Sequence, residues 1–320
     1  MNVLALKRMA SEVAASRDHH RRRFGEAVTG LTREVSQQYE TQLDRILTVG
    51  YGRKSSDTPE SRWQKALFTY LVSMQWVGWG DCEFGPPLGL RDHSEIYALG
   101  MIAYLGARLV DDAIDGHIDY KGRFPSYYGY LVNELDVCDA EGTCAAAGTF
   151  LITASLRRMI KLGCSSVAAA IMQLYNRVAS GVLCETLSGG IPIGPDLYRS
   201  VIRHKAVAYD RMLHVVFFRN AEPLIQSRIL SFLSAKSESS QLLNDLCDES
   251  DDRSRNQMSI LGVRNMDRET VVQTVLNDFV HLWKESEDLH PDIRNAMAVR
   301  LNDSLQKITR SPNLRPEWMT

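Results

Sequence analysis

Two clusters of acidic residues, each placed directly after a long apolar stretch, constrain the fold of this chain more than any other feature. The first, from Asp111 to Asp115, reads DDAID, and the second extends from Asn244 to Asp252, about 130 residues further on. The apolar residues at 96–110 have helical spacing, which puts Asp111 and Asp115 on one face of a helix. Carboxylates at this spacing repel each other, and burying a carboxylate without a partner is costly. The placement of these acids therefore indicates a bound cation.

The second cluster has the same character. Asn244, Asp248 and Asp252 follow one another at intervals of four residues and would form one oxygen-bearing stripe on a helix. Carboxylate and amide oxygens suit Mg²⁺, which usually shares its coordination shell with substrate phosphates. Two such stripes facing each other across a helical cavity would hold Mg²⁺ ions that bind a diphosphate. The alternative for either cluster alone is a solvated helix end.

Composition and charge are those of an ordinary soluble globular protein, with 44% apolar residues, 24% charged residues and a net charge of −2. This balance gives no global basic field, so we expect no nucleic-acid partner. Six cysteines are scattered without a CxxC pair, which favours reduced thiols and a cytoplasmic location. No run of 18 apolar residues occurs, and the apolar run at the N-terminus is too short for a secretory signal, so we expect no stable membrane insertion.

Helical periodicity dominates the chain, and alternating strand patterns are nearly absent. We expect helices at about 30–49, 59–77, 92–116, 141–161, 165–187, 195–219, 222–252, 267–286 and 290–309, and a loop from Gly78 to Gly89. No repeat or linker interrupts the pattern, so the chain reads as a single all-α domain over residues 1–320, with 1–29 as a frayed N-terminal segment.

Four ordered motifs carry a resemblance that extends from about Arg62 to Ser259. Residues 111–115 form a complete DDxxD, and 241–248 read QLLNDLCD, which is similar to QxxDDxxD with Asn244 in place of the first Asp. Between them, 181–185 (GVLCE) resemble a GQxxD motif, and Lys205 stands where a lysine-threonine motif is expected. The sequence resembles the trans-isoprenyl diphosphate synthases and the class I terpene synthases that share their fold.

The resemblance implies an isoprenoid synthase helical bundle with a central active-site cavity, three Mg²⁺ ions and an allylic prenyl diphosphate as substrate, commonly in a homodimer. It makes Asp111, Asp115 and Lys205 the catalytic residues, with the Lys205 ammonium on the leaving diphosphate. The metal ligands that it implies are Asp111, Asp112, Asp115, Asn244, Asp248 and Asp252. The candidate diphosphate-binding residues are Lys205, Lys121, Arg123, Arg62, Lys65 and Gln241.

Departures from the family pattern bear on the reaction. Elongating synthases carry two arginines after DDxxD and a GKxxRP-like element upstream, which bind isopentenyl diphosphate. Here Tyr120 and Lys121 replace the arginine pair, followed by Arg123, and only Arg62 and Lys65 remain of the upstream element. Because an ammonium does not replace a bidentate guanidinium at a phosphate site, we expect a terpene cyclase. The alternatives are a prenyltransferase that uses isopentenyl diphosphate or another acceptor, and a non-catalytic partner subunit of a synthase.

Three residues are candidates for the pocket that receives the prenyl chain. Gly106 and Ala107, five and four residues before Asp111, are small, and in related synthases these positions shape the pocket floor. Their size favours a C20 over a C15 substrate; the alternative is close helix packing at Gly106. Glu185 is the acidic residue of the third motif. Arg108 is expected to form a structural ion pair with the acid cluster.

Overall fold

The structure is a computed structural model that describes residues 3–51, 59–90, 94–119, 124–134, 137–188, 193–254, 263, 267–311 and 314. Over these residues the chain is all-α, as predicted, with one isolated bridge between Asp119 and Pro125. The first helices are α1 (Val3–Tyr51), α2 (Pro59–Met74), the 3₁₀ helix η1 (Gln75–Phe84), α3 (Ser94–Asp115), α4 (Tyr127–Asn133) and α5 (Ala140–Lys161). They are followed by α6 (Ser165–Ser188), α7 (Pro195–Ile202), the π helix η2 (Arg203–Val207), α8 (Ala208–Phe217), α9 (Pro223–Ser254), α10 (Arg268–Glu285) and α11 (Pro291–Arg310).

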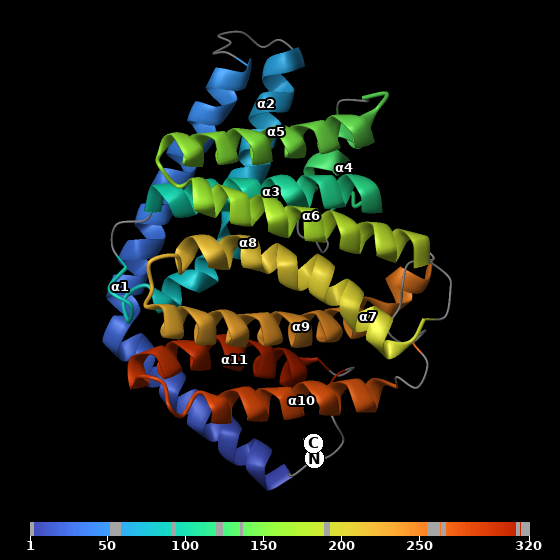
Figure 1. The fold of residues 1–320 in the computed structure, drawn as a ribbon. Helices are drawn as coiled ribbons and strands as arrows, with labels where there is room; N and C mark the ends of the chain where they lie inside the picture. Colours follow the sequence, from blue (N-terminus) through green and yellow to red (C-terminus); the bar gives the residue numbers. More distant parts are fainter. Residues whose placement is uncertain are drawn as a thin grey trace.

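Helix α3 is the most apolar and most buried of the central helices. It packs against α1, α5 and α8, while α6 packs against α8 and η2, and α9 against α10 and η2 (Figure 1). Almost every residue from Tyr97 to Leu109 is buried. The helix therefore leaves the core only near its C-terminus, where the acidic residues begin.

The N-terminal residues differ from the frayed segment that we expected at 1–29. Helix α1 begins at Val3, and Leu6, Met9 and Val13 are buried. The helix runs along one side of the bundle and packs against α11 and α3 (Figure 1). These apolar residues are spaced three and four apart, but the many charged residues between them concealed the periodicity.

The predicted loop from Gly78 to Gly89 is also wrong in its first half, which is η1. Two glycines here serve close packing: a Cβ on Gly78 would lie 3.0 Å from the Met101 side chain, and one on Gly80 would overlap the Arg300 guanidinium. Tyr97 donates a hydrogen bond from its hydroxyl to the Gly78 carbonyl. The glycines thus let η1 approach α3 and α11 instead of interrupting the helix.

Helix α6 is the one helix among the described residues that is long and apolar enough to cross a membrane. Within the bundle it packs against α5, α7, η2 and α8. A packed core helix meets the same criteria of length and composition.

Candidate active site

The first acidic motif occupies the last turn of α3. Asp111 and Asp115 lie on one face, with side chains that are 17% and 15% exposed, so water reaches both carboxylates. Gly116 ends the helix in the left-handed conformation, at φ +65°, and the amide of His117 donates to the Asp112 carbonyl at 3.0 Å. This is the hydrogen-bond pattern of a glycine-terminated helix.

Lys205, on η2, lies against this turn of α3. Its Nζ lies 2.6 Å from Glu185 Oε2, 3.3 Å from Asp111 Oδ1 and 3.6 Å from Asp115 Oδ2. We call Asp111, Asp115, Glu185 and Lys205 the acid-lysine cluster. Three of the four predicted motifs, separated by 20 to 70 residues in sequence, thus contribute side chains to one site.

Local backbone features bring Lys205 to this position. The helix predicted at 195–219 is divided into α7, η2 and α8, and the π-helical turn at 203–207 contains Lys205. Such turns are rare and often occur at functional sites. Gly181 on α6 lets η2 approach, because a Cβ there would lie 2.6 Å from the Lys205 amide nitrogen. Glu185, one turn further along α6, then reaches the Lys205 ammonium.

The charges of the acid-lysine cluster are strongly coupled. Burial alone would lower the pKa of Lys205, but Asp111, Glu185 and Asp115 outweigh it and raise the pKa above 10.5. Burial raises the pKa of Glu185 and of Asp115, whereas Lys205 and Arg108 hold the pKa of Asp111 below 3.8 against the effect of burial. With the three carboxylates ionised, the cluster carries three negative charges and one positive charge, so a net charge of −2 is left for a cation to compensate.

Asp112 has different surroundings from its two neighbours. It is buried, accepts a hydrogen bond from the Tyr70 hydroxyl at 3.0 Å, and pairs with Arg108 Nη2 at 2.9 Å. The expected structural ion pair of Arg108 is therefore present. These contacts tie α2 to the end of α3 and engage both carboxylate oxygens of Asp112, so its role as a metal ligand stays a prediction.

In the second acidic motif, Asn244 and Asp245 point to different neighbours. Asn244 Oδ1 accepts a hydrogen bond from Lys307 Nζ on α11. Asp245 accepts hydrogen bonds from the Tyr198 hydroxyl and from Gln241 Nε2, the latter at 2.6 Å. Burial raises the pKa of Asp245 to about 6, and the charges of Glu185 and Lys205 act on it. Asp245, which we did not select from the sequence, is thus electrostatically coupled to the acid-lysine cluster.

The remaining predicted ligands are placed as follows. Asp248 is exposed on α9, and the backbone of Asp252 belongs to the same helix, but its side chain lies outside the described residues. Lys121 and Arg123 lie outside the described residues as well. Arg62 and Lys65 are exposed on α2. Helix α2 packs against α3 and α4, near the end of α3 that bears the acidic motif (Figure 1).

The two small residues before the motif serve helix packing. A Cβ on Gly106 would stand 2.8 Å from the Gly148 carbonyl oxygen of α5, and Ala107 is buried. This geometry favours close packing of α3 and α5 over an open pocket floor at Gly106. Tyr104, seven residues before Asp111, stacks on Tyr209 of α8 with ring centroids 3.8 Å apart. The stacked pair lies between α3, which carries Asp111 and Asp115, and α8, which follows the η2 turn that carries Lys205.

His117 is a possible metal ligand that we did not predict from the sequence, and it lies beside Asp111 and Asp115. Ligand atoms of Asp111, Asp115 and His117 all lie within 4.8 Å of one another. Two carboxylates and an imidazole form a chemically suitable donor set for a divalent cation. A glycine directly after the acidic motif was the available signal, because such a terminus turns the following residue back toward the helix.

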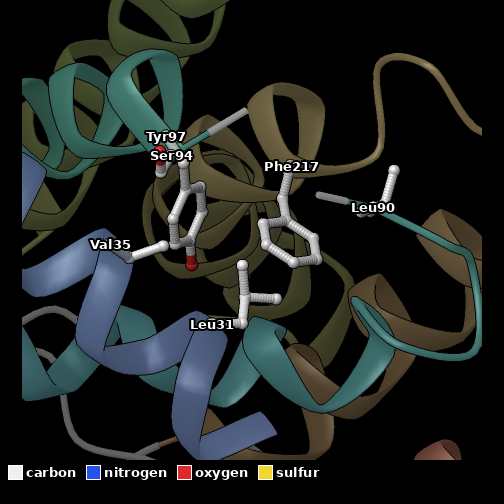
Figure 2. A pocket seen from close by; sticks show the side chains of 6 residues that line it. All are labelled: Leu31, Val35, Leu90, Ser94, Tyr97 and Phe217. Atoms are coloured by element: carbon white, nitrogen blue, oxygen red, sulfur yellow. The ribbon is translucent and has the colours of Figure 1, made fainter. Parts of the chain in front are cut away.

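A small hollow lies at the other end of α3. It is lined by Leu31, Val35, Leu90, Ser94, Tyr97 and Phe217 (Figure 2). It has room for about one water molecule. Tyr97 is 14 residues before Asp111, which along a helix corresponds to roughly 20 Å. The hollow is too small and too distant to hold a substrate of the acidic motif.

Comparisons with solved structures identify the architecture. A geranyltranstransferase from Thermotoga maritima matches with a TM-score of 0.63 and 12% identity, covering 87% of this chain and 99% of that one. A decaprenyl diphosphate synthase from Rhodobacter capsulatus matches with a TM-score of 0.58 and 15% identity, covering 92% and 89%. The chain has the isoprenoid synthase fold.

A third match with this fold is a geranyltransferase from Helicobacter pylori in complex with magnesium and isoprenyl diphosphate, with a TM-score of 0.58, 14% identity, and coverage of 87% of this chain and 97% of that one. No family model and no curated protein sequence match the chain. At these identities the likeness establishes the isoprenoid synthase fold, and the chemistry has to be argued from the site.

Proposed function

We propose that this protein is a divalent-metal-dependent prenyltransferase that ionises an allylic prenyl diphosphate and transfers the prenyl group to an acceptor. The observation that carries the proposal is the acid-lysine cluster, in which the Lys205 ammonium lies 3.3 Å from Asp111 and 3.6 Å from Asp115, at carboxylates that remain partly exposed. The cluster belongs to a fold shared with a geranyltransferase that was solved with magnesium and isoprenyl diphosphate.

Bound Mg²⁺, three ions by analogy, would neutralise the negative charge that develops on the leaving diphosphate. Asp111 and Asp115 would hold these ions on the α3 side, and Asn244, Asp248 and Asp252 are the candidates on α9. Among the residues that the structure describes, Lys205 is our candidate cation for the diphosphate. Glu185 lies closest to its ammonium, so the ammonium keeps one partner when it turns from Asp111 and Asp115 toward the substrate.

The allylic chain would leave the diphosphate in the direction of the Tyr104 and Tyr209 rings. Their stack lies between α3 and α8, and the hydroxyl of Tyr209 is engaged with the Tyr104 carbonyl at 3.1 Å. Aromatic faces stabilise a nearby cation, so the two rings would shelter the positive charge left on the prenyl group. Gly106 packs against α5, so its small size does not support the expected preference for C20, and chain length is left to the assay.

The comparisons alter our expectation of the reaction. From the sequence we expected a cyclase, but the three structural neighbours described above are prenyltransferases by name. These names support the prenyltransferase, which was the alternative in our sequence analysis. A cyclase is the second candidate, supported by Tyr120 and Lys121 in place of an arginine pair and by Asn244, Asp248 and Asp252, whose four-residue intervals resemble those of the terpene synthase metal-binding triad.

The deciding experiment incubates the purified protein and Mg²⁺ with geranyl, farnesyl or geranylgeranyl diphosphate, each with and without isopentenyl diphosphate, and analyses hydrocarbons and diphosphates. Longer diphosphates that require isopentenyl diphosphate would establish prenyl transfer. Hydrocarbon or alcohol formed from one allylic substrate alone would establish the cyclase. The inactive control is Asp111→Asn, which keeps the side-chain size.

Absence of product in every incubation would contradict both enzymatic proposals with these substrates. Binding of Mg²⁺ and inorganic diphosphate by the protein would then separate the possibilities. Binding that Asp111→Asn abolishes would indicate a different acceptor. No binding would favour a non-catalytic partner subunit, the remaining alternative from the sequence.

A further inference from the structure

We propose that His117 is a nitrogen ligand of the cation held by Asp111 and Asp115, and that this centre consequently prefers a transition-metal ion such as Mn²⁺ or Co²⁺ to Mg²⁺. The inference rests on the metal site of the proposed function and adds a residue outside the acidic motif. It is carried by the position, the surroundings and the chemistry of the His117 imidazole.

The position of His117 is set by the backbone. Gly116 adopts φ +65°, which residues other than glycine rarely do, and the His117 amide donates to the Asp112 carbonyl at 3.0 Å. This turn folds the residue after the glycine back over the last turn of α3. The imidazole therefore lies beside Asp111 and Asp115, although it follows the end of the helix.

The segment after His117 holds it in this place. The His117 carbonyl accepts a hydrogen bond from the Ser126 hydroxyl, and the Ser126 amide donates to the Ile118 carbonyl at 3.0 Å. Ser126 also caps α4 through the Gly129 amide, at 2.8 Å. A Cβ on Gly129 would stand 1.9 Å from the Ile118 carbonyl oxygen, so this close approach requires glycine. Contacts to the backbone of His117 and of its neighbour Ile118 thus hold this turn without involving the imidazole.

The Nδ1 atom of His117 is buried and makes no hydrogen bond among the described residues. It lies 3.4 Å from Asp112 Oδ1 and 4.0 Å from Asp115 Oδ2. Asp112 is already bound by Arg108 at 2.9 Å and by the Tyr70 hydroxyl at 3.0 Å. A buried polar atom without a hydrogen bond costs free energy, and Asp112 already has other partners for its carboxylate than His117 Nδ1. A cation shared with Asp111 and Asp115 would satisfy it.

The donor set determines which cation fits. Oxygen ligands alone suit Mg²⁺, whereas an imidazole nitrogen favours later divalent ions, whose affinity for nitrogen and oxygen sites rises from Mn²⁺ to Co²⁺. The ligand atoms of Asp111, Asp115 and His117 lie within 4.8 Å of one another, close enough to share one ion. The site thus differs from an all-carboxylate magnesium site by one nitrogen.

The test uses the full chain loaded with Mn²⁺, alone and with inorganic diphosphate. Pulsed electron paramagnetic resonance detects a ¹⁴N nucleus bound to Mn²⁺ directly, independently of turnover. We expect ¹⁴N modulation in the wild type and in His281→Ala, the matched control, because His281 is 69% exposed on α10. We expect none in His117→Ala. Titration with Mg²⁺ should displace Mn²⁺ from His117→Ala at a Mg²⁺ concentration about tenfold or more below the one that displaces it from the wild type.

Three outcomes are distinguishable. Nitrogen coupling that disappears only in His117→Ala supports the proposal. Mn²⁺ that binds in an Asp111-dependent manner without nitrogen coupling overturns it and leaves the proposed function intact. Mn²⁺ that does not bind under either condition overturns both. Because the backbone holds the His117 turn, circular dichroism of His117→Ala should match the wild type, and a lower melting temperature without loss of ¹⁴N coupling would indicate a purely structural histidine.

Discussion

Two groups of ionisable side chains in this bundle differ in how their surroundings shift the pKa of a lysine. The acid-lysine cluster is partly exposed to water, and its carboxylates raise the pKa of its lysine. The other group, which we call the buried polar cluster, consists of Asp81, Tyr97, His214, Lys236 and Arg300. Burial lowers the pKa of Lys236 to about 8 and that of His214 to about 3, and it raises the pKa of Asp81 to about 6.

The difference separates a binding site from a structural network. In the buried polar cluster, the environment favours the neutral form of each shifted group, and partners lie within the fold: Tyr97 donates to Asp81 at 3.2 Å, and His214 lies 3.5 Å from Asp81. In the acid-lysine cluster, three carboxylates surround one ammonium, and Arg108, which pairs with Asp112, also lies 3.5 Å from Asp111. Excess charge of one sign is costly for stability, so it indicates a ligand of opposite charge.

An Asp→Asn substitution made once in each cluster should give the largest difference in activity. Asp111→Asn should lower kcat by about a thousandfold, because it removes a charge that positions the cation. Asp81→Asn should leave kcat within about threefold and should not lower the free energy of unfolding, because it removes a buried charge that the fold disfavours. Steady-state kinetics and urea unfolding measure both effects. Similar losses of activity in both variants would abolish the distinction.

The two lysines provide the second comparison. Lys205→Met leaves Asp111, Asp115 and Glu185 without their ammonium, and it should lower the free energy of unfolding by about 3 kcal/mol. Lys236→Met should be neutral or stabilising. Added Mg²⁺ should restore part of the stability of Lys205→Met, because it neutralises the same carboxylates. Equal destabilisation by the two substitutions would argue against this account.

The pH dependence of stability sharpens the contrast further. Lys236 has a folded pKa of about 8, below its usual 10.5, so above pH 8 the unfolded chain binds more protons than the folded protein. Stability should therefore rise with pH in the wild type relative to Lys236→Met, by about 1–2 kcal/mol between pH 8 and pH 9.5. Lys205 has a raised pKa, so its contribution is fully present below pH 10.5 and should not change in this window. The prediction would be contradicted if the difference in unfolding free energy between the wild type and Lys236→Met were the same at pH 8 and at pH 9.5.

Sequence periodicity was sufficient for most of the fold. Six of the predicted helices agree with the structure to within two residues at each end: 92–116, 141–161, 165–187, 222–252, 267–286 and 290–309. Their apolar stripes determine them locally. The start of α1 could not be predicted in this way, because its few apolar residues among many charges form a helix face only in contact with α11 and α3.

For the candidate site, the family resemblance predicted which motifs converge but not how each helix is rotated. Asp111, Glu185 and Lys205 came from motifs and meet in space. Asn244 and Asp245 are adjacent, and only packing decides that Asn244 faces Lys307 while Asp245 faces Tyr198. The direction of a side chain after a helix end depends on a backbone angle. This is why no periodic pattern pointed to the histidine after Gly116.

Glycine substitutions give the smallest effects and test how each cluster is supported. In Gly181→Ala the new methyl group would lie 2.6 Å from the Lys205 amide nitrogen, which belongs to a backbone that cannot yield without moving η2. In Gly80→Ala it would meet the Arg300 guanidinium, the flexible end of a side chain that can shift. We therefore expect Gly181→Ala to lower the free energy of unfolding by about 1 kcal/mol and Gly80→Ala by less.

The two glycine variants should also differ in activity. Gly181→Ala displaces the turn that carries Lys205, so kcat should fall even where the protein remains folded, whereas Gly80→Ala should leave kcat unchanged. Kinetics measured at a temperature where both variants are fully folded would separate the two effects. If Gly80→Ala lowered kcat as much as Gly181→Ala, the buried polar cluster would be coupled to the site, and its separation from the acid-lysine cluster would have to be abandoned.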